Sequence, residues 1–268
     1  MNHKINEKRI DLEKLNKNIK EKYDENISLI TRIQEIYNAL LECGVEEEIF
    51  KQMINSINEF KKELNEKIQL SNIRIPEFSE NILSNNLDDL KKILDTLTNY
   101  ESQLKNYLNL LSNQNERLSN MLNILKKIIE VYINNLQKRI SDWHILLKEL
   151  KAQPEHVDLF IKKKNDFEKL TLGFNIQNKD TSEIVFILKE LHSIESEMKL
   201  ILQRVLGEPY FSIYLKVIDY IKSQNEPVRL YDLVNFIANE TNMDVREILN
   251  IIFELDKIGI LEIKIRKY

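Results

Sequence analysis

The stretch that decides the fold runs from Leu87 to Leu150 and reads LDDLKKILDTLTNYESQLKNYLNLLSNQNERLSNMLNILKKIIEVYINNLQKRISDWHILLKEL. Alternate steps of three and four residues give two rows of positions, and sixteen of these nineteen positions are apolar. The polar exceptions are Glu101, Asn115 and Arg139. A pattern sustained over nine heptads without Gly or Pro predicts one long helix with a coiled-coil seam. At about 1.5 Å per residue, that helix would be roughly 95 Å long.

Residues 5–43 repeat the pattern more weakly, and the phase restarts three residues late at Gly44. The shift indicates either a local overwinding of one helix or a true break. The run from Glu46 to Glu48 suits the positive N-terminus of a new helix, which favours a kink or a break. The other interpretation of this run is a solvated charged face.

The two seams have similar lengths, over residues 5–72 and 87–150, and the segment between them has the composition of a loop. We therefore predict a mainly α protein in which residues 1–150 form a long antiparallel coiled-coil hairpin, with its loop at about residues 73–86. The alternative is a three-helix bundle that turns back at Gly44. The apolar stripes must pack on each other or on another chain.

Both seams contain an asparagine, Asn26 in the first and Asn115 in the second. A buried Asn can fix the register of a coiled coil at some cost in stability. A wet, weakly packed stretch is the other interpretation.

Two shorter connecting helices are expected over residues 151–207. Pro154 ends the seam and suits the start of the first of them, and Ser182 is placed to cap the second. Gly207 to Pro209 marks the boundary of a further domain.

Residues 208–268 predict a helix, a short extended piece around Val228, two more helices and a strand after Gly259. Asp244 and Glu247 form a capping-box pattern at the start of the third helix. This order of elements resembles the winged helix-turn-helix superfamily. The resemblance implies DNA binding through the third helix, as in many members, or protein docking, as in many others.

Charge favours protein docking, with DNA as the alternative. Residues 208–268 carry eight basic and ten acidic side chains, whereas DNA-binding domains are usually basic where they dock. The outward residues of the third helix are expected to sum to zero charge, and the C-terminal tail alone is basic. These predicted partner or DNA contacts are Arg246, Glu247, Asn250, Glu254 and Lys257 on the helix, and Lys264, Arg266 and Lys267 in the tail.

A helical region followed by a winged helix is also similar to archaeal cell-division proteins related to ESCRT-III. Those proteins usually begin with a basic helix, whereas residues 1–41 here hold eight Lys and Arg against seven acids. Membrane remodelling is therefore not carried over from this resemblance.

Residues 98–120 hold four charged side chains, although long exposed coiled coils usually carry dense surface charge. We expect a second copy or a partner to cover this stretch at a surface that includes Asn109 and Gln114.

The remaining features argue against an enzyme. The four glycines are far apart, so a phosphate-binding loop is not expected, and none of the four histidines has another at helical ligand spacing. Cys43 is the single cysteine, and net charge is −4. With no apolar run near the roughly 20 residues that cross a bilayer, we expect no membrane span and a cytoplasmic location. The sequence thus predicts a non-enzymatic scaffold without metal, cofactor or small-molecule substrate, which binds a protein partner.

Overall fold

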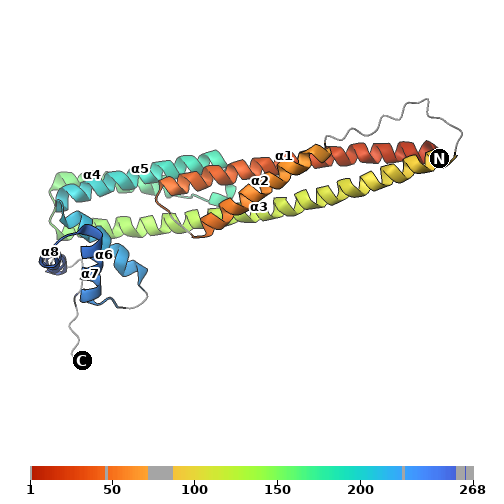
Figure 1. Cartoon of the computed structure of the whole chain (residues 1–268). Coiled ribbons are helices and arrows are strands. Elements are labelled where there is room, and N and C mark those ends of the chain that lie inside the picture. The colour runs from red at the N-terminus through yellow and green to blue at the C-terminus, as the bar shows by residue number, and fades with distance from the viewer. Residues whose placement is uncertain (1, 46–47, 72–86, 225–226, 258–262, 264–268) are drawn as a thin grey trace. The chain divides into compact units, whose positions relative to one another are not determined.

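The computed structural model describes residues 2–45, 48–71, 87–224, 227–257 and 263. The chain divides into two compact units, Met1–Glu130 with Ile176–Leu188 (unit 1) and Val131–Asn175 with Lys189–Tyr268 (unit 2). The regular secondary structure of the described residues is helical throughout (Figure 1). Among these residues, no helix combines the length and the apolar character that a bilayer crossing requires.

Helix α3 (Leu87–Glu149) is the long helix that the heptad pattern predicts, and it continues from unit 1 into unit 2. None of its seam side chains whose burial is described is exposed. Five successive leucines of one row are fully enclosed, each at most 2% exposed: Leu97, Leu104, Leu111, Leu118 and Leu125.

In unit 1, helix α1 (Asn2–Glu42) runs parallel to α3. Near its start, the Lys8 ammonium pairs with Glu101 of α3, and further along Asn26 contacts Asn115 of α3. Residue numbers therefore rise together along both helices. The prediction of an antiparallel hairpin is wrong. A stripe of apolar side chains can pack against a parallel or an antiparallel partner, so the heptad pattern does not determine the relative direction of the two helices.

The phase shift at Gly44 is a true break. The Gly44 N–H donates to the Leu41 carbonyl (2.9 Å) and the Val45 N–H to the Leu40 carbonyl (3.0 Å), which is the Schellman pattern of a helix end. Gly44 has a φ of 72°, a conformation that residues with a side chain rarely adopt. The first seam is therefore two helices, not one arm over residues 5–72.

Helix α2 (Glu48–Ser71) folds back along α1. The Phe50 ring packs edge-on against Tyr37, with 5.2 Å between ring centroids, and the Lys61 ammonium donates to the Gln34 amide oxygen (3.1 Å). This arrangement matches the three-helix alternative that turns back at Gly44. The predicted loop at about residues 73–86 lies outside the described residues.

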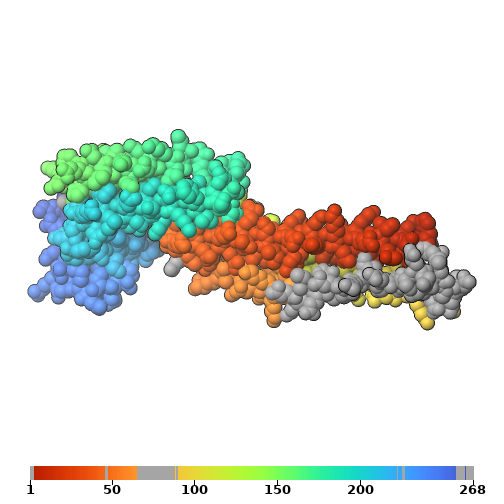
Figure 2. Space-filling model, turned by 90° about the horizontal axis from the view of Figure 1, so that it is seen from above, coloured from red at the N-terminus to blue at the C-terminus, as the bar shows by residue number. Residues whose placement is uncertain are grey.

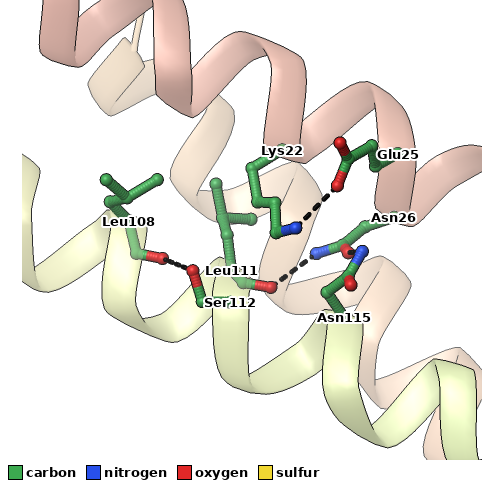
Figure 3. A network of polar contacts seen from close by, with 7 residues as sticks. All are labelled: Lys22, Glu25, Asn26, Leu108, Leu111, Ser112 and Asn115. Carbon is green, nitrogen blue, oxygen red and sulfur yellow. Dashed lines mark hydrogen bonds and ion pairs between the residues drawn. The ribbon is translucent and has the colours of Figure 1, made fainter.

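The polar residues of the α3 seam have partners rather than gaps opposite them. Asn26 is fully buried, and its amide donates to the Leu111 carbonyl (3.0 Å) and accepts from the Asn115 amide (2.9 Å), as Figure 3 shows. Glu101 accepts from Lys105 (2.6 Å) as well as from Lys8. The two seam asparagines thus form a hydrogen-bonded pair in which Asn26 is buried and Asn115 is half-buried, which favours the first of the two interpretations above.

The short helix η1 (Ile176–Asn178) and the start of α5 (Thr181–Leu206) complete unit 1. Asp180 caps α5: its carboxylate accepts from the Glu183 N–H (2.8 Å), while its own N–H donates to Glu183 (3.2 Å). Ser182, the expected cap, instead donates to Asp180 (2.8 Å). Asp180 satisfies a free backbone N–H from just outside the helix, whereas Ser182 lies two residues further along and inside the first turn.

Unit 2 is built from the end of α3, helix α4 (Pro154–Thr171), the rest of α5 and three C-terminal helices. Pro154 occupies the start of α4, as predicted. Helices α4 and α5 lie side by side (Figure 2), where Lys163 pairs with Glu197 (2.6 Å). Glu195 of α5, 3% exposed, binds Arg139, the third polar residue of the α3 seam, at 2.9 Å.

The C-terminal helices are α6 (Tyr210–Ser223), α7 (Leu230–Thr241) and α8 (Val245–Lys257), and each packs on the other two. The three helices are those that the sequence predicts for residues 208–268. Residues 227–229, around Val228, are described but form no strand. The strand predicted after Gly259 lies outside the described residues except for Ile263, so the described part of residues 208–268 contains three helices and no wing strand.

Candidate binding surface on the C-terminal helices

Helix α8 is fixed at its start and along one side. The Asp244 carboxylate accepts a hydrogen bond from the Arg246 N–H (2.8 Å), which satisfies one of the free donors at the helix N-terminus. Just before it, Asn242 adopts the left-handed conformation with a φ of 54° and ends α7. The inward side of α8 is apolar and at most 3% exposed: Ile248, Ile251, Ile252 and Leu255. The opposite side of α8 is therefore held outward on a rigid support.

The structure places all five predicted helix contacts on this outward side. The exposed side chains are Arg246, Glu247, Asn250, Glu254 and Lys257. Two of them are basic and two are acidic, and Nζ of Lys257 lies 3.7 Å from Oε2 of Glu254. The predicted tail contacts, Lys264, Arg266 and Lys267, lie outside the described residues. The described part of the surface has no net charge.

Exposed apolar side chains flank this polar face. Val245 is 44% exposed and Phe253 is 49% exposed, and both belong to α8. Tyr231, in the first turn of α7, is 75% exposed. The sequence analysis did not single out these residues. A helical wheel contains the signal, because Val245 and Phe253 fall outside the arc of the four buried residues of α8.

The two residues predicted for an oligomer surface are separated by the fold of unit 1. Asn109 is exposed on α3, whereas Gln114 is 4% exposed and its amide donates to Glu63 of α2 (2.7 Å). The Arg117 guanidinium lies 4.9 Å from the centroid of the Phe60 ring, also on α2. Helix α2 of the same chain covers this side of the weakly charged stretch. Gln114 is thus not available to a second copy, and that part of the prediction is corrected.

Among the residues that the structure describes, no group of three or more His, Cys, Asp or Glu side chains is placed to hold a metal ion. Comparison with models of known protein families, with curated proteins and with solved structures finds no match.

Proposed function

We propose that this chain is a non-enzymatic coiled-coil scaffold that docks a protein partner through the outward face of α8. The observation that carries the proposal is the composition of that face. It combines balanced charge with an aromatic and an aliphatic side chain, each more than two-fifths exposed, on a helix whose other side is buried.

Protein interfaces fit this composition better than DNA does. Binding energy at protein interfaces is concentrated in a few aromatic and Arg side chains near the centre of the contact. Phe253 and Arg246 are exposed residues of these two types. DNA affinity instead comes largely from basic side chains that neutralise phosphates. On α8, Glu247 and Glu254 offset the charge of Arg246 and Lys257.

The test replaces Phe253 by a photo-crosslinking phenylalanine analogue in the full-length chain, identifies the captured protein, and then measures its binding by calorimetry. Phe253→Ala should weaken binding about 30-fold, because truncating a central aromatic residue costs about 2 kcal/mol. Phe186→Ala is the matched control, since Phe186 is 59% exposed but belongs to unit 1. Equal affinities for the wild type and Phe253→Ala would refute the role of this face.

DNA binding is the second candidate, favoured by the outward Arg246 and Lys257 and by the basic residues of the tail. Fluorescence anisotropy with a labelled duplex at about 50 mM and 200 mM salt separates the two candidates, because phosphate neutralisation makes affinity fall steeply with salt. We expect no binding at either concentration. Tight binding at low salt that Lys264→Ala, Arg266→Ala and Lys267→Ala together abolish would favour DNA instead.

A further inference from the structure

Unit 2 contains a pocket of about 310 Å³ that lies apart from the outward face of α8. Its lining comes from the end of α3, from Lys199 of α5 and from α6. Trp143, Leu146 and Tyr214 form its buried part, each at most 4% exposed. A volume of this size is at the lower end of the range of ligand pockets and suits a single large side chain.

The positive charges at the pocket are already engaged. Arg139 and Lys199 both line it, and both bind the buried carboxylate of Glu195, at 2.9 Å and 3.0 Å. The phenol of Tyr132 also donates to Glu195 (3.2 Å). An incoming anion would have to compete with Glu195 for these two cations, so the pocket is poorly suited to an acidic ligand.

Three carboxylates that line the pocket are not engaged. Asp142, Glu149 and Asp219 line it, are exposed, and form no ion pair with the described part of the chain. Three carboxylates and two cations therefore line the pocket, which leaves an excess of one negative charge. The excess is two when Glu195 is counted, which lies behind the lining and binds both cations. Burial raises the pKa of the Tyr214 hydroxyl to about 12, and the charges of Asp142 and Asp219 act in the same direction. Both carboxylates therefore act on the interior of the pocket.

The walls of the pocket also contain exposed or half-buried apolar side chains. Ile145, 59% exposed, stands on α3, and Ile218 faces the pocket from α6. An arginine side chain matches both features, because its aliphatic stem packs on apolar walls while its guanidinium binds carboxylates. A lysine ammonium is more strongly hydrated and loses more on entering such a site.

We propose that this pocket binds an arginine side chain, flanked by aliphatic residues, from a partner protein. The guanidinium meets Asp142 and Asp219, the stem lies along Ile145 and Ile218, and the flanking residues cover the rim. This site is independent of the docking face on α8. The chain then engages two distinct partner segments, or two parts of one partner.

The test exploits Trp143, which is the single tryptophan of the chain and lies in the pocket. The full-length protein is titrated with the peptide acetyl-Ile-Arg-Ile-amide while tryptophan emission is recorded. We expect a saturable change in emission that weakens as salt rises from about 50 mM to 500 mM, because exposed charges are screened. The corresponding lysine peptide, acetyl-Ile-Lys-Ile-amide, should bind more weakly than the arginine peptide. The glutamate peptide, acetyl-Ile-Glu-Ile-amide, should produce no saturable change in emission.

The variant Asp142→Asn with Asp219→Asn should weaken the arginine peptide at least about fivefold, as expected for the loss of two partly exposed charge pairs. Its matched control is Asp158→Asn with Asp232→Asn, which removes two exposed carboxylates of unit 2 that lie outside the pocket. Both variants leave the helices intact, which circular dichroism verifies. No emission change with the arginine peptide, an equal response to the glutamate peptide, or equal affinities for the two variants would overturn the proposal. Phe253→Ala leaves this titration unchanged, so failure here and failure of the α8 face are distinguishable.

Discussion

The substitution Asn115→Ala tests whether the hydrogen-bonded pair of Asn26 and Asn115 stabilises unit 1. It removes the hydrogen bond from the Asn115 amide to the Asn26 side-chain oxygen (2.9 Å). Because Asn26 is 0% exposed, that oxygen loses its partner at a buried position. An unsatisfied buried acceptor costs about 2 kcal/mol, and the better helix propensity of Ala returns about 0.5 kcal/mol. The expected net loss of stability is about 1.5 kcal/mol.

Asn109→Ala is the matched control, since Asn109 lies on the same helix but is exposed. This variant should gain about 0.5 kcal/mol from propensity alone, so the two variants should differ by about 2 kcal/mol. Urea unfolding followed by far-ultraviolet circular dichroism measures the difference. With a slope of about 3 kcal/mol per M, it amounts to about 0.7 M between the two midpoints.

Replacing both members of the pair, as Asn26→Leu with Asn115→Leu, removes the orphaned oxygen as well as the hydrogen bond. The double variant should be at least as stable as the wild type, because apolar replacement of both partners leaves no side-chain group unsatisfied. The Leu111 carbonyl also loses its Asn26 donor, but it lies within helix α3, where backbone N–H groups remain. A double variant less stable than Asn115→Ala, or an Asn115→Ala midpoint equal to that of Asn109→Ala, would refute the reasoning.

Three further predictions concern single residues. Gly44→Ala should lower the stability of unit 1 by about 1–2 kcal/mol in urea unfolding, because a residue with a side chain is strained at a φ of 72°. An added Cβ would meet no atom within 4 Å, so the loss would come from the backbone conformation alone, and a neutral effect would contradict this cause. Glu195→Gln should lower the stability of unit 2 by about 2 kcal/mol, because Arg139 and Lys199 lose their shared carboxylate and remain partly exposed. Unfolding is monitored through Trp143 emission, and a stabilised variant would show that the desolvation of Glu195 outweighs its ion pairs. Burial, reinforced by Lys148 and Lys164, holds the pKa of His144 below its ordinary value. Unit 2 should therefore keep constant stability with respect to this group above about pH 6.5 and lose stability as the pH falls below it, since the unfolded chain takes up the proton first. His144→Phe, which preserves an aromatic contact with Phe160, should reduce that slope, and an unchanged slope would exclude His144 as its source.

The sequence was sufficient for α3, because hydrophobic periodicity is a local property and nothing between Leu87 and Glu149 interrupts it. It also indicated where the first seam changes, since a phase shift of three residues coincides with Gly44. It did not contain the direction of α1 relative to α3. That direction depends on α2 folding back, which the heptad pattern leaves open.

The error at Gln114 also arose because a local sequence pattern does not identify the packing partner. A shortage of charge over residues 98–120 correctly indicated that something covers this part of α3, but composition does not distinguish a second chain from α2 of the same chain. On α8, the charged residues were placed by their alternation with the buried isoleucines. Phe253 was missed because an apolar residue in a helix is assigned to the core by default, and its exposure depends on which arc faces α6 and α7.

The parallel pairing of α1 with α3 sets an order of events during synthesis. Tyr37 and Phe50 are thirteen residues apart in the chain, so α1 and α2 can associate soon after both leave the ribosome. Asn26 and Asn115 are separated by 89 residues, and Lys8 and Glu101 by 93. Until α3 emerges, the side of α1 that it will bury has no permanent cover, and loop closure over such separations is slow. Nascent chains that stall before residue 115 would therefore expose Leu12 and Ile19, which are buried in the complete fold. Such chains would be substrates for chaperones that recognise apolar segments.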